Sequence, residues 1–312
     1  MGTWVQQQVE WTWQGQKLNT SFEELKVCCL TWNMQGQPPP KELNTLLPEA
    51  HHLYIICTQE SCQHIGWSML FPWVEAWEKA ILEFLGENYL LLSSRSLGGT
   101  HLGVFLHSSV TSVVSELSSD TVSTGLFNIL WNKGGVGVVL QLGSKKLLVL
   151  GCHLSSGQNN FAQRTTSLDR IEKNLKLFCG KGAEEFVSDK ADAAILLGDL
   201  NYRVRGERAE VLKLINQSQK EKLWEMDQLN TEMQKGTLCK GYTEGKVEFA
   251  PTYKYLPNSS CFTGNRVPSW TDRVLYKDSS GILRQSSYGS LRENFDSDHK
   301  PVFSQFILSN YL

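Results

Sequence analysis

Five apolar segments of this chain each meet a short group of polar residues at one end, and this pattern restricts the fold more than any other feature. The polar residues at these ends are Asn33, Glu60, His153, Asp199 with Asn201, and Asp298 with His299. If the strands of one domain ended together, their polar ends would form a single pocket on a rigid base. The pattern therefore predicts a polar site along one edge of a sheet.

The alternation of apolar and amphipathic segments predicts a mixed α/β architecture. The expected strands cover residues 26–32, 53–58, 89–93, 102–107, 136–142, 146–152, 193–199, 272–276 and 301–308. The expected helices cover residues 73–85, 161–179 and 207–216. No repeat or linker divides the chain, so we expect residues 24–312 to form a single domain and residues 1–23 to form an added strand or arm.

Composition restricts the class of protein. The chain has 312 residues, of which 41% are hydrophobic, so it can bury a large core. A net charge of −2 excludes a globally basic nucleic-acid coat. The eight cysteines include no C-x-x-C pair, and no apolar segment reaches the length that spans a bilayer. We therefore expect a soluble cytoplasmic domain with reduced thiols.

The polar ends carry the residue types of a phosphoester hydrolase. Glu60 and Asp199 offer the one or two carboxylates that Mg²⁺ takes beside water and phosphate oxygens, whereas Zn²⁺ would need more clustered His or Cys. Alternate residues of an extended strand face the same side, so Asp199 and Asn201 are expected to point together. Five cations would make the pocket positive despite the acidic total, namely Lys133, Arg203, Lys254, Arg266 and Arg273.

Each feature also has a structural explanation when taken alone. A single acidic residue at a strand end is more often a helix cap or part of a surface ion pair. The glycine-rich "NKGGVGV" at residues 132–138 is most simply a hairpin turn, since it lacks the spacing of a P-loop. The prediction of a site depends on the joint occurrence of these features.

Several motifs, in this order, resemble the inositol polyphosphate 5-phosphatases of the endonuclease/exonuclease/phosphatase superfamily. They are "TWN", "TQES", "NKGGV", "HL" with Arg164 downstream, "GDLNYR", "PTYKY", "RVPSWTDRVLY" and "SDHKPV", and the resemblance runs from about residue 25 to residue 307. "GDLNYR" and "SDH" are typical of the superfamily, whereas "PTYK" and "RVPSWTDR" are specific to the 5-phosphatases. The resemblance implies a two-sheet β-sandwich flanked by helices, deoxyribonuclease-like and four-layered, as a 5-phosphatase catalytic domain with Mg²⁺ as cofactor.

The resemblance also implies roles for individual residues. Glu60 would be the principal magnesium ligand, with Asn33 beside it and Asp298 near the metal. Asp199 would orient and help deprotonate the attacking water, and Asn201 would hold the scissile phosphate. The remaining catalytic contacts would be His153 and His299 to the phosphate, with the His299 ring oriented by Asp272.

Substrate recognition is expected in the later motifs. Tyr253, Lys254, Arg266 and Arg273 resemble residues that bind the other phosphates of the inositol ring. Family members that act on 4,5-bisphosphorylated rings commonly carry lysine where this chain has Gly264. The segment after His153 also departs from the family, with Gly157 and Thr165 where His and Asn are usual, so we expect altered affinity with the chemistry retained.

The expected partner is an inositol phosphate or a phosphoinositide, reached by a monomeric domain at the cytosolic face of a membrane and without nucleic acid. Trp67, Met69, Leu70 and Phe71 of "IGWSMLFPW" are candidates for membrane contact, with a buried loop as the alternative. Two rival functions remain open at this point. They are a phosphoinositide-binding module without catalysis and a nuclease of the same superfamily.

Overall fold

The structure is a computed structural model that describes residues 24–309 except residues 49, 66–68, 73, 126–131, 179–184 and 294–295. For residues 62–65 and 69–72 it describes the backbone alone. The expected N-terminal arm at residues 1–23 lies outside the described residues.

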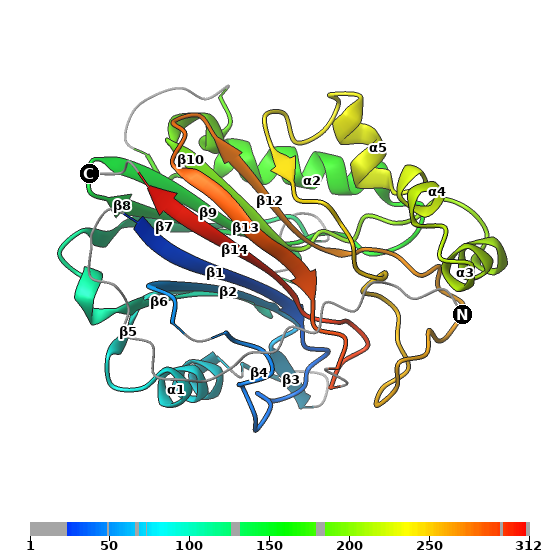
Figure 1. Cartoon of the computed structure of the whole chain (residues 1–312), viewed down its shortest axis with the longest axis horizontal. Helices are drawn as coiled ribbons and strands as arrows, with labels where there is room; N and C mark the ends of the chain where they lie inside the picture. Colours follow the sequence, from blue (N-terminus) through cyan, green and yellow to red (C-terminus); the bar gives the residue numbers. More distant parts are fainter. Residues whose placement is uncertain are drawn as a thin grey trace.

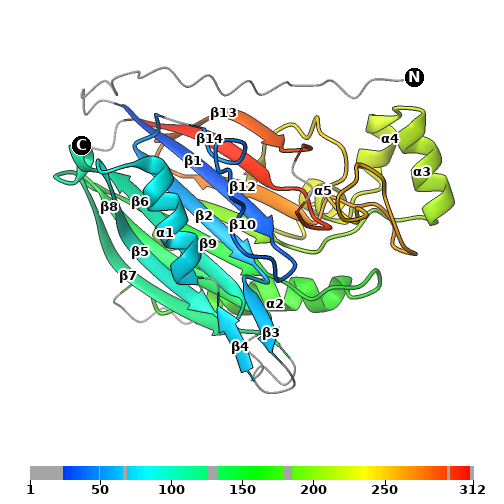
Figure 2. The same cartoon turned by 90° about the horizontal axis from the view of Figure 1, so that it is seen from below.

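Two sheets of six strands each make up the body of the described chain (Figure 1). The first sheet has the order β13 (Leu283–Ser290), β14 (Val302–Ser309), β1 (Glu24–Asn33), β2 (Leu53–Gln59), β6 (Thr100–His107) and β5 (Tyr89–Leu97). The second has the order β11 (Thr243–Glu244), β12 (Asp272–Asp278), β10 (Ala193–Asp199), β9 (Lys145–His153), β8 (Gly134–Leu142) and β7 (Val114–Ser123). β3 (Cys62–Ile65) and β4 (Met69–Pro72) form a separate antiparallel hairpin, which projects from the body of the molecule (Figure 2).

The two sheets pack face to face, and helices cover their outer faces (Figures 1 and 2). β1 shows how one strand serves two layers, because successive side chains point to opposite faces. Cys29 lies in the apolar core between the sheets, whereas Cys28 lies in the cluster that α1 (Val74–Leu85) covers. α2 (Phe161–Asn174) covers the second sheet through Leu168 and Ile171. The expected four-layer β-sandwich is confirmed.

Further helices lie in the connections between strands, within the second sheet or, for the first 3₁₀ helix, between the two sheets. They are α3 (Arg208–Asn216), α4 (Lys220–Glu225), α5 (Gln228–Gln234) and the short 3₁₀ helices η1 (Ser108–Val110) and η3 (Val187–Lys190). Among the helices that the structure describes, none has both the length and the apolar composition needed to cross a bilayer.

All nine expected strands and three expected helices are present, with small shifts at their ends. α2 is shorter than predicted, because Leu175 adopts an extended conformation and the chain then buries Leu175 and Leu177 against the sheet. β7, β11, β13, α4, α5 and the β3–β4 hairpin were not predicted.

Strand directions bring the polar ends together. β1 is parallel to β2 and β9 is parallel to β10, so each pair ends at the same edge. β14 and β12 are antiparallel to β1 and β10, so their first residues lie at that edge too. The site edge is therefore formed by the ends of four strands and the beginnings of two.

Candidate active site

The register of the second sheet places three predicted site residues in one row. His153 pairs with Asp199 across β9 and β10, and Asp199 pairs with Asp272 across β10 and β12. Asn33, at the end of β1 in the facing sheet, reaches this row by donating from Nδ2 to Asp199 Oδ2 over 3.1 Å. The same Nδ2 donates to Glu60 Oε1 over 3.2 Å. The predicted gathering of polar strand ends at one edge is thus confirmed.

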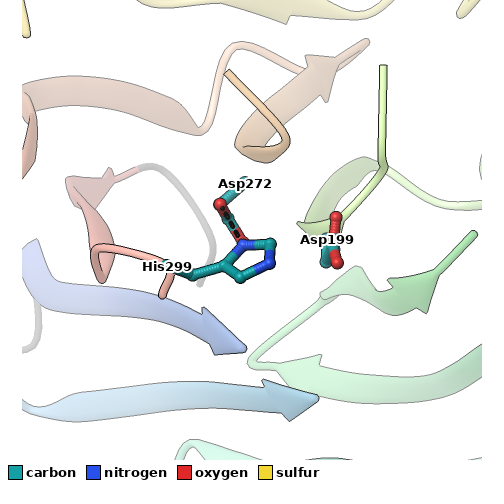
Figure 3. Close-up of side chains that lie close together, drawn as sticks. All are labelled: Asp199, Asp272 and His299. Atoms are coloured by element: carbon teal, nitrogen blue, oxygen red, sulfur yellow. Dashed lines mark hydrogen bonds and ion pairs between the residues drawn. The ribbon is translucent and has the colours of Figure 1, made fainter. Parts of the chain in front are cut away.

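Asp272 holds the imidazole of His299 in a fixed orientation (Figure 3). The His299 Nδ1 lies 2.9 Å from Asp272 Oδ2, and both side chains are buried. Burial alone would lower the pKa of His299, but the charge and hydrogen bond of Asp272 outweigh it and raise that pKa to about 9. His299 is therefore an imidazolium at neutral pH, and Asp199 lies on the side of the ring away from Asp272.

Two threonine hydroxyls complete the surroundings of Asp272. Thr252 and Thr271 donate to Asp272 Oδ2 over 2.7 and 2.8 Å, and both are fully buried. Sequence reasoning missed these residues, although each directly adjoins a predicted site residue in "PTYKY" or "SWTDR". Their position next to a motif residue was the available signal.

Asp199 is a buried carboxylate surrounded by positive charge. Burial would raise its pKa, but the hydrogen bond from His153 and the charges of His299 and Lys133 lower it well below its usual range. His153 Nε2 lies 3.2 Å from Asp199 Oδ2, and Lys133 Nζ contacts the same ring nitrogen. Burial, followed by the charge of Lys133, lowers the pKa of His153, so we assign a neutral imidazole beside an ionised Asp199.

Unusual backbone conformations on both sides of Asp199 fix the path of the loop that follows β10. Gly198 has φ +147°, and a Cβ there would lie 1.9 Å from the carbonyl oxygen of Cys152. Only glycine allows β10 to approach β9 so closely beside Asp199. Asn201 has φ +57°, a left-handed conformation that a non-glycine residue keeps only when its surroundings hold it.

Several contacts hold Asn201. Its N–H donates to Asp199 Oδ1 over 3.1 Å, and its Nδ2 donates to the carbonyl of Leu154 over 3.1 Å. The Arg203 guanidinium donates to both the carbonyl and the Oδ1 of Asn201, and stacks at 4.6 Å on the ring of Tyr253. Tyr253 in turn lies 4.5 Å from the His299 ring. Asn201, Arg203, Tyr253 and His299 therefore form one continuous packed group.

The remaining predicted cations fall into two groups. Lys254 is partly exposed and pairs with Asp298 over 2.8 Å, and Arg266 is exposed on the following loop. Arg273, expected to bind substrate, is completely buried and pairs with Asp227 at 3.0 Å and Glu244 at 2.5 Å. Because side chains alternate along β12, Arg273 faces away from the side of Asp272, and its prediction as a substrate contact is corrected to a structural role.

The oxygen donors suit a hard divalent cation. Glu60 has a side chain that is 48% exposed, whereas Asp199, Asp272 and Asp298 are buried. Asp298 is occupied by Lys254, and Asp272 by His299 and two hydroxyls. Asp199, Asp272 and His299 also lie close enough together to be considered as a metal site, but Asp272 already accepts hydrogen bonds from Thr252 and Thr271 and holds His299 Nδ1. Glu60, the exposed carboxylate, is the better fit, with the Asn33 amide nitrogen donating a hydrogen bond to it.

The candidate membrane residues lie partly outside the described part of the chain. Trp67 lies outside the described residues, and Met69, Leu70 and Phe71 lie in β4, whose backbone alone is described. Their contact with a membrane stays a prediction.

Fold and site together define a family. The model of the endonuclease/exonuclease/phosphatase family 2 matches residues 30–305, so the chain belongs to this family. Within it, phosphatidylinositol polyphosphate 5-phosphatase type IV of Homo sapiens is 32% identical over 298 residues, covering 88% of this chain and 45% of the relative. Phosphatidylinositol 4,5-bisphosphate 5-phosphatase INP51 of Saccharomyces cerevisiae is 29% identical, covering 92% of this chain and 32% of the relative.

A solved structure supports the same placement. The inositol polyphosphate 5-phosphatase domain of SPsynaptojanin, crystallised with inositol (1,4)-bisphosphate and a calcium ion, matches with a TM-score of 0.81 and 27% identity. The match covers 91% of this chain and 84% of that domain. The Cimex nitrophorin ferrous NO complex matches with a TM-score of 0.74 at 22% identity, which shows the fold alone.

The resemblance to inositol polyphosphate 5-phosphatases is therefore confirmed for family and fold. The expected class of enzyme, a phosphoric monoester hydrolase, is the class to which these named relatives belong. The chain spans less than half of the length of the two curated relatives named above.

Proposed function

We propose that this chain hydrolyses the 5-phosphate of inositol polyphosphates or phosphoinositide lipids in a magnesium-dependent reaction. One observation carries the proposal, namely a buried Asp199 that lies close to the His299 imidazole, whose Nδ1 Asp272 holds at 2.9 Å. A phosphomonoester needs this pairing, because water must be oriented for attack while charge develops on the phosphate oxygens. The named relatives and the inositol bisphosphate bound by the similar domain support the choice of substrate.

Each residue of the site has a separate role in the proposed hydrolysis. Asp199 accepts a hydrogen bond from the attacking water and orients it, because its lowered pKa keeps the carboxylate ionised. Asn201 uses one amide N–H for the Leu154 carbonyl and offers the other to the scissile phosphate. His299 donates to the same phosphate and stabilises its negative charge, and His153 is a further contact.

Glu60 is the residue that would hold Mg²⁺, with Asn33 beside it. When bound, the ion neutralises phosphate charge and polarises the phosphorus–oxygen bonds. Asp298 is better explained as the partner of Lys254, so its expected place near the metal is the weakest of the three metal assignments.

Lys254 and Arg266, with Tyr253, are the proposed contacts to the other ring phosphates, and Lys133 extends the positive surface on the His153 side. Magnesium as the specific ion, membrane contact through residues 65–73, a monomeric state and a place at the cytosolic face of membranes all belong to this proposal.

The test is phosphate release from a panel of soluble inositol phosphates and short- and long-chain phosphoinositides, with magnesium and with a chelator. Release that needs magnesium and is confined to 5-phosphorylated compounds is the expected result, and it ranks soluble against lipid substrates. A folded chain that binds these compounds without releasing phosphate would be a binding module, and nicking of plasmid DNA would indicate a nuclease.

A further inference from the structure

Two guanidinium groups are buried behind the site with only neutral hydrogen-bond partners among the described residues. Arg164 and Arg203 are 0% and 3% exposed, and neither forms an ion pair with a described carboxylate. Arg273, equally buried, has two carboxylates. A buried charge without a counter-charge is costly, so the difference between Arg164 and Arg273 calls for an explanation.

Arg164 connects α2 to the loop that follows His153. Its Nη1 donates to the carbonyls of Ser155 and Gly157 over 3.1 and 2.7 Å, and its Nη2 donates to Gln228 Oε1 over 2.7 Å. Burial lowers the pKa of Arg164 to about 10, with Arg203 lowering it further and Asp199 opposing the shift, so the group stays charged at neutral pH.

Gln228 also binds the backbone of Arg203, in the loop that follows Asp199. Its Oε1 also accepts from the Arg203 N–H over 3.0 Å, and its own N–H donates to the Arg203 carbonyl over 2.9 Å. One glutamine therefore holds both backbone groups of Arg203, whose side chain holds Asn201 in its left-handed conformation. Gln228 Nε2 completes the link by donating to the Gln158 carbonyl over 3.3 Å.

We infer that Arg164 and Gln228 are positioning residues that join the loop after His153 to the loop after Asn201. They leave Arg164 without an ion-paired carboxylate, so that its charge also stabilises an anion in the site. A glutamine does this where a glutamate would not, because it supplies the same acceptor without neutralising the guanidinium. The identification of this anion as a substrate phosphate rests on the proposed function. The connection between the two loops is independent of that function.

The substitution Gln228→Glu changes the charge of this side chain and leaves its size nearly unchanged. It keeps an acceptor for Arg164 and the Arg203 N–H, and adds the missing negative charge. We expect the folded variant to lose about tenfold in affinity for inorganic phosphate, used as the probe and measured by calorimetry, with a parallel fall in kcat. Wild-type phosphate affinity in folded Gln228→Glu would overturn the electrostatic part. The matched control is Gln163→Glu, an equal change of charge at an exposed position of α2.

Gln228→Met and Arg164→Met remove the connection itself. Misplaced catalytic groups can cost about 10²-fold in rate, so we expect a fall in kcat of that order with a smaller change in KM. Arg164→Lys should recover part of this loss relative to Arg164→Met, because lysine keeps the positive charge and a single donor nitrogen. Arg170→Met, at an exposed position of the same helix, is the control.

Hydrogen exchange tests the connection without using activity. Faster exchange confined to residues 154–158 and 200–204 in Gln228→Met is the expected result. Unchanged exchange in both segments would overturn the positioning role, even if the variant had lost activity. Absence of phosphate release from the wild-type chain would count against the proposed function and leave this exchange result to decide the connection. If Gln228→Glu does not fold, phosphate affinity in Arg164→Lys against Arg164→Met decides the charge, and equal affinities would contradict it.

Discussion

Two buried carboxyl groups in this molecule have pKa values that are shifted in opposite directions. Asp199, at the site edge, is 1% exposed, and its pKa is lowered by His153, His299 and Lys133 despite burial. Glu172, on α2, is 5% exposed, and burial raises its pKa although Ser188 and Tyr242 donate hydrogen bonds to it. These hydrogen bonds therefore do not offset the effect of burial on the pKa of Glu172. The concentration of cations distinguishes the site edge from the α2 layer.

The largest expected effect is on turnover at the site edge. Asp199→Ala, Asn201→Ala and His299→Ala should each lower kcat by about 10³-fold or more, because each removes a group that acts on the reacting phosphate or water. Steady-state phosphate release measures this, and circular dichroism confirms folding. Near-wild-type turnover in all three variants would refute the assigned site. Asp169→Ala, on the exposed face of α2, should change nothing.

The dependence of activity on magnesium should be changed by substitution of the exposed Glu60, which we assign as the metal ligand. Glu60→Gln should raise the magnesium concentration for half-maximal activity by about tenfold or more, since it removes a charged ligand for a hard cation. A magnesium titration of activity tests this, with exposed Glu42→Gln as control. An unchanged titration in Glu60→Gln would place the ion elsewhere.

A smaller effect is expected at the exposed, substrate-facing side. Gly264→Lys should improve kcat/KM for 4,5-bisphosphorylated substrates several-fold more than for substrates without the 4-phosphate, by adding one cation. Gly264 has φ +67°, and a Cβ added there would meet no atom within 4 Å, so Gly264→Ala controls for backbone strain. Equal gains on both classes of substrate would contradict the interpretation.

The smallest effect concerns stability away from the site. Because the pKa of Glu172 is raised in the folded state, the folded protein binds this proton more tightly than the unfolded chain does. Stability is therefore lost as pH rises from the unfolded pKa through the folded one. Glu172→Gln removes this loss.

Urea unfolding at pH 4 and pH 7 tests the stability prediction. Relative to wild type, Glu172→Gln should gain about 1 kcal/mol more in the free energy of unfolding at pH 7 than at pH 4. A difference independent of pH would show that Glu172 titrates normally.

The sequence predicted the buried strands well and the exposed ones poorly. β7 and β13 are each the outermost strand at one end of their described sheet. They read "VSELSSDTVS" and "LRQSSYGS", without a continuous apolar face. Pairing with the long apolar strand that follows each of them, β8 and β14, makes them strands. The site edge could be predicted because its strands are long and apolar.

The sequence predicted which residues lie near the site better than it predicted what their side chains contact. Arg273 was assigned to substrate because it resembles family residues that bind the other ring phosphates. Alternation along a strand already separates its side chain from that of Asp272. Gln228 could not be found, because its contacts with Arg164 and Arg203 exist only after α5 packs beside the site.

The central claim is that this site removes one particular phosphate by attack of water. The most direct measurement is ³¹P NMR of the reaction with inositol 1,4,5-trisphosphate in ¹⁸O-labelled water. The account predicts loss of the 5-phosphate resonance, with inositol 1,4-bisphosphate as product and one ¹⁸O atom in the released phosphate. Loss of a different phosphate, or released phosphate without the label, would contradict it.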